Sequence, residues 1–387
     1  MKFEKVVFVR YFPLTNAIYR DFYFEELIQN NIEVEYLDVT GLFDFKVSDS
    51  FDFKGIVKIS SYKQLDFYLK NNSGSNILYI SIMTFEWRVF RLFRLFTNYH
   101  VKFGVFARGV FPSIIYKDKK SKIAWIVNTM SFSKVADYCF NKITSYAKKY
   151  TYIKSYDYIF KAGEFGYNGL GIGSEIDLEN SKIIEINTVD YDQFVLHKEL
   201  PYLHDEEYIV FLDQYLPYHP DATFFKIKTV GSEQYFYEVN SFFDRIELAT
   251  GKNVIIAAHP KAMRYREFNP FNNRTIFFNQ SNDLVKNAFL VLTHASTAIC
   301  FPICYQKKII LLVSDYLDKV LPQFSMTAQS IKKACGATII AMDNENDFKI
   351  PEKINPIKYK DFKYKYLTSI ESENMLSKDI FINFIKK

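Results

Sequence analysis

The chain has 387 residues, of which 49% are hydrophobic and 24% are charged, a balance typical of a soluble globular protein with two domains. Its formal net charge of +5 is too small to indicate a nucleic-acid partner. Its four cysteines stand in apolar or helical contexts with no second pair at metal-ligand spacing, which predicts four buried thiols in a reducing compartment.

The N-terminus, "MKFEKVVFVRYF", carries Lys and Glu where a signal peptide would need a continuous apolar run. No segment reaches the ~18 consecutive apolar residues of a membrane span. These features predict a cytoplasmic protein, which can also associate with the inner face of the cytoplasmic membrane.

The first half of the chain alternates predicted strands and helices. "KVVFVRYF" (5–12) and "IEVEYLDV" (32–39) are short and largely apolar, and the segment between them has helical periodicity. This β-α-β order is typical of the start of a doubly wound parallel sheet. Further strands are predicted at "GIVKIS" (55–60), "NILYISIM" (76–83), "VKFGVFARG" (101–109), "YDYIFKAGEFG" (156–166) and "KIIEINTVDYDQF" (182–194).

A polar, irregular segment, "VLHKELPYLHDEE" (195–207), indicates a linker between an N-terminal domain of residues 1–200 and a C-terminal domain of residues 201–387. The alternation restarts after it, and the last helix, 371–387, can pack back on the N-terminal domain. The predicted fold class is α/β, with two Rossmann-like domains facing a central cleft. Strands of the second half are predicted at 208–214, 253–259, 275–279, 289–294 and 308–313.

Three strands of the second half end in polar residues, and in a parallel sheet the loops that follow them share one edge. In "LTHASTA", His294 ends a strand, and Ser296 and Thr297 open the next helix. Hydroxyls at a helix start cap its N–H groups, and the same N–H groups can hold a phosphate. Simple capping is the alternative.

"AAHPKAMR" offers the same chemistry. The His259 imidazole can donate to a phosphate oxygen, Lys261 can neutralise the phosphate, and Pro260 fixes the turn. No acid or thiol stands near His259 in the sequence to suggest a nucleophilic triad. We therefore predict a phosphate ligand, the alternative being a histidine packed at a strand end.

"FLDQYLPYHPD" supplies acid–base candidates. Asp213, His219 and Asp221 share one loop after a strand, and a sugar transfer needs a base that takes the proton of the acceptor hydroxyl. Asp221 is preferred over Asp213. Asp221 as a helix cap and Asp213 as a structural residue are the alternatives.

The order of these motifs resembles that of the bacterial sialyltransferases and related nonulosonic-acid glycosyltransferases of capsule and lipooligosaccharide biosynthesis, which have the GT-B fold. Those families share an acidic motif, a His-Pro motif and a Ser/Ser or Ser/Thr motif. The resemblance covers roughly Tyr208 to Val313 and places the His-Pro motif on His259 and Pro260.

The same resemblance places the hydroxyl motif on Ser296 and Thr297 and makes Asp221 the base, with Ala222 where the family has a second acid. It implies that the histidine and the hydroxyls bind the phosphate of a CMP-activated sugar. No Walker motif, GxGxxG spacing or well-placed DxD pair is present, so no metal or other cofactor is expected.

Two features of the first half complete the prediction. Arg108, before Gly109, can grip an anionic group or can lie in an ordinary turn. The basic aromatic residues near 85–122 can lie on an anionic membrane surface, or they can form a core helix with a solvated basic face.

Together with these residues, the resemblance implies an inverting, metal-independent glycosyltransferase. It would move an acidic sugar (sialic, legionaminic or pseudaminic acid, or Kdo) from a CMP-linked donor to an oligosaccharide or lipid-linked acceptor of a bacterial surface glycan. One alternative is a transferase that uses a UDP- or CDP-linked donor in surface polysaccharide or teichoic-acid-like polymer synthesis. The other is a non-catalytic protein that binds a nucleotide or a glycan.

Overall fold

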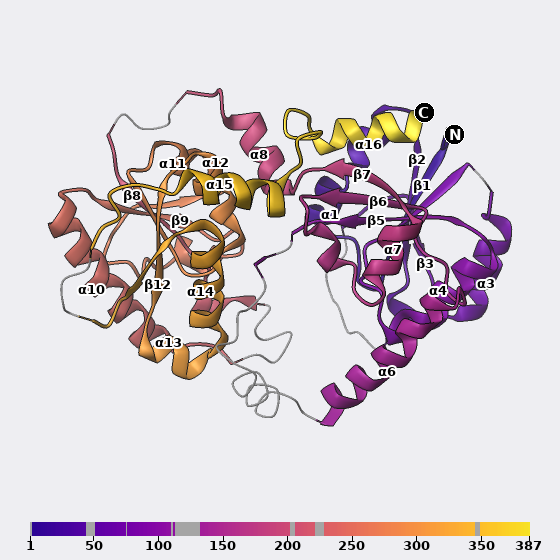
Figure 1. The fold of residues 1–387 in the computed structure, drawn as a ribbon, viewed down its shortest axis with the longest axis horizontal. Coiled ribbons are helices and arrows are strands. Elements are labelled where there is room, and N and C mark those ends of the chain that lie inside the picture. The colour runs from indigo at the N-terminus through magenta and orange to yellow at the C-terminus, as the bar shows by residue number, and fades with distance from the viewer. Residues whose placement is uncertain are drawn as a thin grey trace. The chain divides into compact units, whose positions relative to one another are not determined.

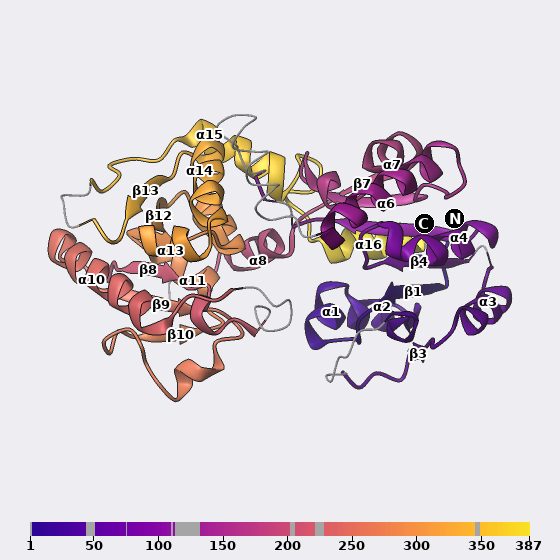
Figure 2. The same ribbon diagram turned by 90° about the horizontal axis from the view of Figure 1, so that it is seen from below.

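The structure is a computed structural model that describes residues 2–43, 51–74, 76–109, 111–112, 132–201, 206–220, 228–344 and 349–387. The chain folds into two compact units (Figures 1 and 2). Unit 1 comprises Met1–Val110, Ile123–Val189 and Thr368–Lys387, and unit 2 comprises Phe111–Lys122 and Asp190–Leu367.

Unit 1 contains a sheet of seven parallel strands in the order β3-β2-β1-β4-β5-β6-β7. The strands are β1 (Lys5–Arg10), β2 (Glu33–Asp38), β3 (Ile56–Lys58), β4 (Ile77–Ser81), β5 (Lys102–Ala107), β6 (Tyr158–Ala162) and β7 (Lys182–Ile186). The helices are α1 (Asn16–Asp21), α2 (Phe24–Gln29), α3 (Tyr62–Asn71), α4 (Phe90–Asn98), α6 (Phe132–Lys149), α7 (Ser174–Asn180) and α16 (Ser377–Lys386).

The central strand β1 of unit 1 is apolar on both sides because helices cover both faces of the sheet. Val7 and Val9 of β1 pack in a core with α3 and α4, whereas Val6 and Phe8 pack in a second core with α2 and α16. This alternation follows from the two-residue repeat of a strand and explains why the sequence reads as continuous apolar runs.

The C-terminal helix α16 completes unit 1. Phe381 and Ile385 are buried in the same core as Phe3, and the N–H of Phe3 donates to the carbonyl of Ile385 at 2.9 Å. The chain therefore returns to unit 1 after building unit 2. At the point of return, the Thr368 hydroxyl donates to Asn187 Oδ1 at 2.6 Å. Asn187 lies just before the residue at which the chain leaves unit 1.

Unit 2 contains six parallel strands in the order β10-β9-β8-β11-β12-β13, which is the 3-2-1-4-5-6 order of a Rossmann fold. The strands are β8 (Ile209–Leu212), β9 (Val254–Ala258), β10 (Ile276–Phe278), β11 (Leu290–Thr293), β12 (Lys308–Val313) and β13 (Thr338–Ala341). The helices are α8 (Val189–His197), α10 (Ser232–Thr250), α11 (Ser281–Asn287), α12 (Cys300–Cys304), α13 (Asp315–Val320), α14 (Gln323–Cys335) and α15 (Pro356–Phe362).

The predicted α/β class with two Rossmann-like sheets is confirmed. One predicted strand is wrong in its second part: "KIIEINTVDYDQF" is strand only to Ile186, and Val189 begins α8. Tyr191 and Phe194 of α8 pack with Ile299 of unit 2. The chain therefore enters unit 2 at Asp190, before α8, whereas the sequence placed the boundary after that helix, at residue 200.

The described helices include none that is both long enough and apolar enough to cross a membrane.

Candidate functional site

Three loops meet at the carboxyl edge of the unit 2 sheet, after β9, β8 and β11. Ala257, Leu212 and Thr293 lie side by side in the register of these strands, and the chain leaves the sheet one or two residues later. Neighbouring strands are about 4.8 Å apart, so the loops after β9 and β11 start roughly 10 Å apart, with the β8 loop between them.

Side chains of the β8 loop contact both neighbouring loops. The rings of His219 and His259 lie edge to face, with their centroids 4.9 Å apart. On the other side, the Ala295 N–H donates to Oε1 of Gln214 at 2.7 Å. The loops that follow the three polar strand ends therefore lie next to one another at one edge of the unit 2 sheet.

His259 is half-buried, and its ring orientation is fixed by its own turn. Nδ1 accepts a hydrogen bond from the Lys261 N–H at 3.1 Å. In the neutral ring the proton is then on Nε2, which becomes the donor nitrogen. Pro260 and Lys261 are exposed, as a phosphate grip at this edge would require.

Ser296 and Thr297 open a short helical segment after β11. Ser296 Oγ accepts from the Ala298 N–H at 3.2 Å and so caps the 3₁₀ helix η6 (Thr297–Ile299), which leads into α12. The Ser296 hydroxyl still has its proton to donate, and the Thr297 side chain is exposed. The capping role is observed, and phosphate binding by these two residues stays a prediction.

His294 lies below this surface, in the core of unit 2, with 1% of its area exposed. Nδ1 is 2.7 Å from the Leu312 carbonyl oxygen and Nε2 is 3.1 Å from the Tyr235 hydroxyl. Burial lowers the pKa of His294 to about 4, so the ring is neutral, donates from Nδ1 and accepts at Nε2. A ligand bound at the strand ends would have to break one of these hydrogen bonds before it could bond to the His294 ring.

Asp213 follows β8 and is 4% exposed. Burial raises the pKa of its carboxyl group to about 7, although the N–H groups of Tyr215 and His259 and the Tyr265 hydroxyl favour the charged form. These donors are close but not in full hydrogen-bond geometry, so neither carboxylate oxygen has a partner among the described residues. The Tyr265 hydroxyl is buried without a partner in the same way.

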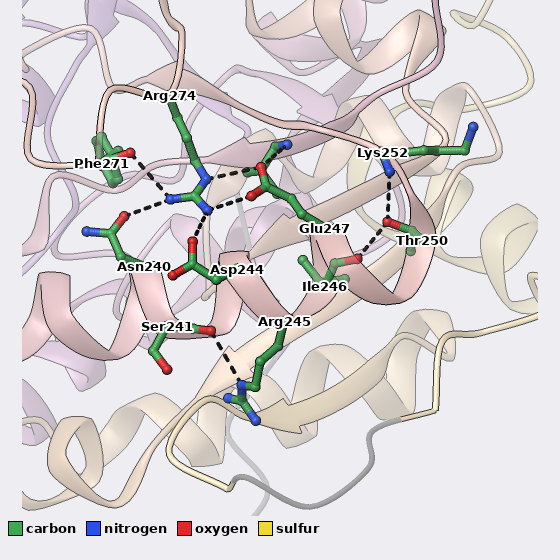
Figure 3. Close-up of polar contacts among 11 residues, drawn as sticks. Asn240, Ser241, Asp244, Arg245, Ile246, Glu247, Thr250, Lys252, Phe271 and Arg274 are labelled. Atoms are coloured by element: carbon green, nitrogen blue, oxygen red, sulfur yellow. Dashed lines mark hydrogen bonds and ion pairs between the residues drawn. The ribbon is translucent and has the colours of Figure 1, made fainter.

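The loop that carries His259 is anchored to α10 at its far end (Figure 3). Arg274, just before β10, donates to Glu247 at 3.1 Å and 2.6 Å and also contacts Asp244. Burial by itself would lower the pKa of Arg274. The hydrogen bonds that Arg274 donates to Glu247 and Asp244 outweigh this effect, so its pKa is raised. This cluster fixes the path of the loop between β9 and β10.

The other site predictions have different outcomes. Asp221 lies outside the described residues. Arg108 is held within unit 1, where its guanidinium donates to the Tyr23 hydroxyl at 2.9 Å and to the Asp21 carbonyl. The Phe22 ring lies 4.8 Å from the guanidinium carbon. These contacts pack Arg108 within unit 1, and anion binding by Arg108 stays a prediction.

The basic aromatic segment that includes α4 packs as a core helix. Phe93 and Phe96 are buried in unit 1, while Arg91 stacks on Tyr62 at 4.1 Å and Arg94 stacks on a neighbouring tyrosine ring. Of the two interpretations of this segment, the core helix with a basic outer face matches α4. The four lysines of the predicted membrane segment lie outside the described residues: Lys117, Lys119, Lys120 and Lys122.

Sequence reasoning missed Gln214, Tyr235 and Tyr265, which tie the strand ends together. Tyr235 could have been found from the helical periodicity of 233–251, which points it toward the sheet. Gln214 and Tyr265 carry no such signal. Among the described residues, no group of three or more His, Cys, Asp or Glu side chains is arranged to hold a metal ion.

No family model matches the chain, and no curated protein matches it. Solved structures that it resembles include the UDP-GlcNAc 2-epimerase from Methanocaldococcus jannaschii, at 12% identity over 92% of this chain and 97% of that one, with a TM-score of 0.42. The S. aureus MnaA–UDP structure has 12% identity over 99% and 96%, with a TM-score of 0.46. The calicheamicin glycosyltransferase CalG4 has 10% identity over 100% and 94%, with a TM-score of 0.44.

At these identities and TM-scores, neither a ligand nor an activity of this chain follows from the matches. The class of protein is defined by its own two sheets: an α/β chain of two Rossmann-like units, as the GT-B expectation requires. None of these three structures is a sialyltransferase.

Proposed function

We propose that the chain is a nucleotide-sugar glycosyltransferase whose unit 2 binds the phosphate of the donor at the carboxyl edge of its sheet. The observation that carries this proposal is the convergence of the β9, β8 and β11 loops through the His219–His259 and Gln214–Ala295 contacts. Open parallel α/β sheets bind their ligands at this edge.

The donor phosphate would be held by groups of three kinds. His259 would donate from Nε2, because its Nδ1 is occupied by the Lys261 N–H. Lys261 would supply a positive charge from an exposed side chain. Ser296 and Thr297 would supply hydroxyls at the start of η6. Charge-assisted hydrogen bonds of this kind are about twice as strong as neutral ones.

Asp221, His219 and Asp213 remain the candidates for the catalytic base. A base must reach the proton of the acceptor hydroxyl within hydrogen-bond distance. Burial gives Asp213 little access to an acceptor, whereas His219 is half-buried beside His259. We therefore keep Asp221 as the proposed base, with His219 as the residue to test beside it.

A phosphate grip of this kind can hold any nucleotide sugar. We place a UDP-linked donor first and a CMP-linked acidic sugar second. The acidic motif behind the CMP-sugar resemblance is incomplete, since Ala222 follows Asp221. The acceptor would be an oligosaccharide or a lipid-linked glycan.

Calorimetric titration of the full chain with UDP, CMP and CDP tests the proposal. We expect one of the three to bind, and His259→Ala and Lys261→Ala each to weaken that binding about tenfold, as loss of one charge-assisted bond would. Lys332→Ala, which removes an exposed lysine of α14, is the matched control and should bind as the parent does.

If no nucleotide binds, or if His259→Ala binds as well as the parent, the proposed phosphate site is wrong. If a nucleotide binds but no transfer or donor hydrolysis is detected with any sugar attached to it, the chain is a binding protein and not an enzyme. Turnover by Asp221→Ala at the parental rate would remove that residue as the base.

A further inference from the structure

Helix α6 of unit 1 exposes a row of large apolar side chains. Ile143 and Tyr150 are 67% and 71% exposed, and Phe140 and Tyr146 are about half exposed, at 50% and 49%. Tyr150 directly follows the helix and continues its last turn, with its N–H donating to the Tyr146 carbonyl at 2.9 Å. We call these four side chains the α6 outer face; Figure 1 shows α6 extending away from the strands of unit 1.

The side of α6 that packs against unit 1 is polar and buried, whereas the side that faces away is apolar and exposed. Lys148 is fully buried and paired with the fully buried Asp177 of α7, and its ammonium lies 4.4 Å from the centre of the Phe85 ring. Thr144, one turn earlier on the same side, is also buried. At 100° per residue, Ile143 and Tyr150 then point away from the unit. The buried ion pair marks the side of α6 that faces unit 1.

The charge around the outer face is positive. From Tyr138 to Tyr156 the chain contains four lysines and no Asp or Glu, and of these Lys148 pairs with Asp177 and Lys154 with Asp157. Two of the lysines, Lys142 and Lys149, are exposed and lie along one flank of the outer face, seven residues apart. Tyrosine rings with exposed hydroxyls beside lysines are typical of helices that lie at the level of lipid headgroups.

We infer that the α6 outer face binds an anionic lipid surface. A second copy of the chain fits the same residues less well. An aromatic side chain presents about 150–250 Å² in all, so the exposed parts of the four side chains total roughly 500 Å². A stable protein interface buries about 800 Å² on each partner.

Vesicle flotation with the full chain tests this inference, and its outcome does not depend on the proposed transferase activity. The parent should float with vesicles that contain phosphatidylglycerol and not with pure phosphatidylcholine, and added salt should weaken the binding. Ile143→Ser combined with Tyr150→Ser should lower binding at least tenfold, because each residue loses its apolar contact with the lipid. Lys142→Glu combined with Lys149→Glu should also lower it.

Unit 2 provides a matched control on α10, where Tyr237 and Leu248 are 71% and 89% exposed. Tyr237→Ser combined with Leu248→Ser should float as the parent does. Cys139 lies on the exposed side of α6, so the prediction that all four thiols are buried is wrong for it. An environment-sensitive dye attached to Cys139 should shift to the blue on anionic vesicles. Thermal unfolding of each variant should match that of the parent, because all the changed side chains are exposed.

Three results would overturn the inference. One is that the parent does not float with either kind of vesicle. Another is that the α10 control loses binding as strongly as the Ile143/Tyr150 variant. The third is that sedimentation shows a dimer that the Ile143/Tyr150 variant converts to a monomer, which would assign the outer face to a second copy.

Discussion

The hydroxyl of Tyr235 lies 3.1 Å from Nε2 of His294, and both groups are buried in unit 2. Because Nδ1 of His294 is held by the Leu312 carbonyl, Nε2 can only accept, and the tyrosine is the donor. This bond joins the first turns of α10 to the end of β11. It places a buried polar pair directly beneath the candidate phosphate site.

Replacing Tyr235 with Phe should therefore destabilise unit 2. The change leaves Nε2 of His294 buried without a donor, which costs about 1–3 kcal/mol. Chemical denaturation, followed by the circular dichroism of the full chain, measures the loss. Tyr237→Phe, two residues away on the exposed side of the same helix, should change the free energy of unfolding by less than about 0.5 kcal/mol. Equal effects of the two variants would show that the Tyr235–His294 bond contributes nothing.

Asp213 should make stability fall as the pH rises. Its pKa is about 7 in the folded chain and 3.8 in the unfolded chain, because burial opposes the charged form. Between these values only the folded state holds the proton, so the contribution of Asp213 to stability is fully present below about pH 4 and is lost as the pH rises to about 7. Asp213→Asn removes this dependence.

The quantity to compare is the free energy of unfolding of Asp213→Asn minus that of the parent. We expect this difference to be larger at pH 8 than at pH 5 by up to about 3 kcal/mol. Unfolding free energies of both proteins at the two pH values give this difference directly. Asp52→Asn, which changes an exposed acid of unit 1, controls for the loss of a carboxylate. If the free energy of unfolding rises more in the parent than in the variant between pH 5 and pH 8, the pKa of Asp213 is lowered and not raised by folding.

The sheets could be predicted from the sequence because buried parallel strands are short, apolar and separated by helical periodicity. The end of α10 could also be predicted, since Gly251 adopts the left-handed φ of 65° that closes a helix. The strand ends at His259 and Ser296 fall at one edge for the same topological reason. The wrong strand after Ile186 came from the β-branched and aromatic residues of α8, whose contacts with α12 are invisible in sequence.

The roles of His294 and Arg108 could not be predicted, because they depend on residues far away along the chain. His294 is held by Tyr235 and Leu312, and Arg108 by Asp21 and Tyr23. A polar residue at a strand end has the same sequence pattern whether it faces a ligand or a buried partner. Only the tertiary contacts distinguish the two cases.

Replacing Arg274 with Met should loosen the loop that carries His259. The variant leaves Glu247 and Asp244 of α10 without their shared cation, and we expect a loss of about 2 kcal/mol in the free energy of unfolding. The affinity for the nucleotide should fall by more than the larger unfolded fraction of the variant accounts for, because Arg274 fixes the path of the loop from β9 to β10. Denaturation and calorimetry on the same preparation measure both effects.

Lys252→Met is the comparison for Arg274→Met. Lys252 pairs with the exposed Glu207 at 2.8 Å, and exposed pairs contribute about 0–1 kcal/mol. It should therefore change neither stability nor binding by much. If Arg274→Met binds the nucleotide as the parent does, the cluster in Figure 3 is structural only.

The buried pair of Lys148 and Asp177 supports the last prediction, which concerns the orientation of α6. Burial lowers the pKa of Lys148 and raises that of Asp177, and each charge is maintained by the other. Lys148→Met leaves the Asp177 carboxylate buried without its cation and should cost about 3–5 kcal/mol. Adding Asp177→Asn removes the uncompensated charge, and the double variant should recover most of this loss.

Denaturation of the two single variants and the double variant forms a cycle that measures the coupling between the side chains. A double variant as unstable as Lys148→Met would mean that the contacts of the Lys148 ammonium with the Phe85 and Tyr156 rings, and not its pairing with Asp177, contribute the stability. In the expected case α6 keeps its rotation in the double variant. Vesicle binding should then survive in a chain that lacks the ion pair, because the lipid-facing side chains have not moved.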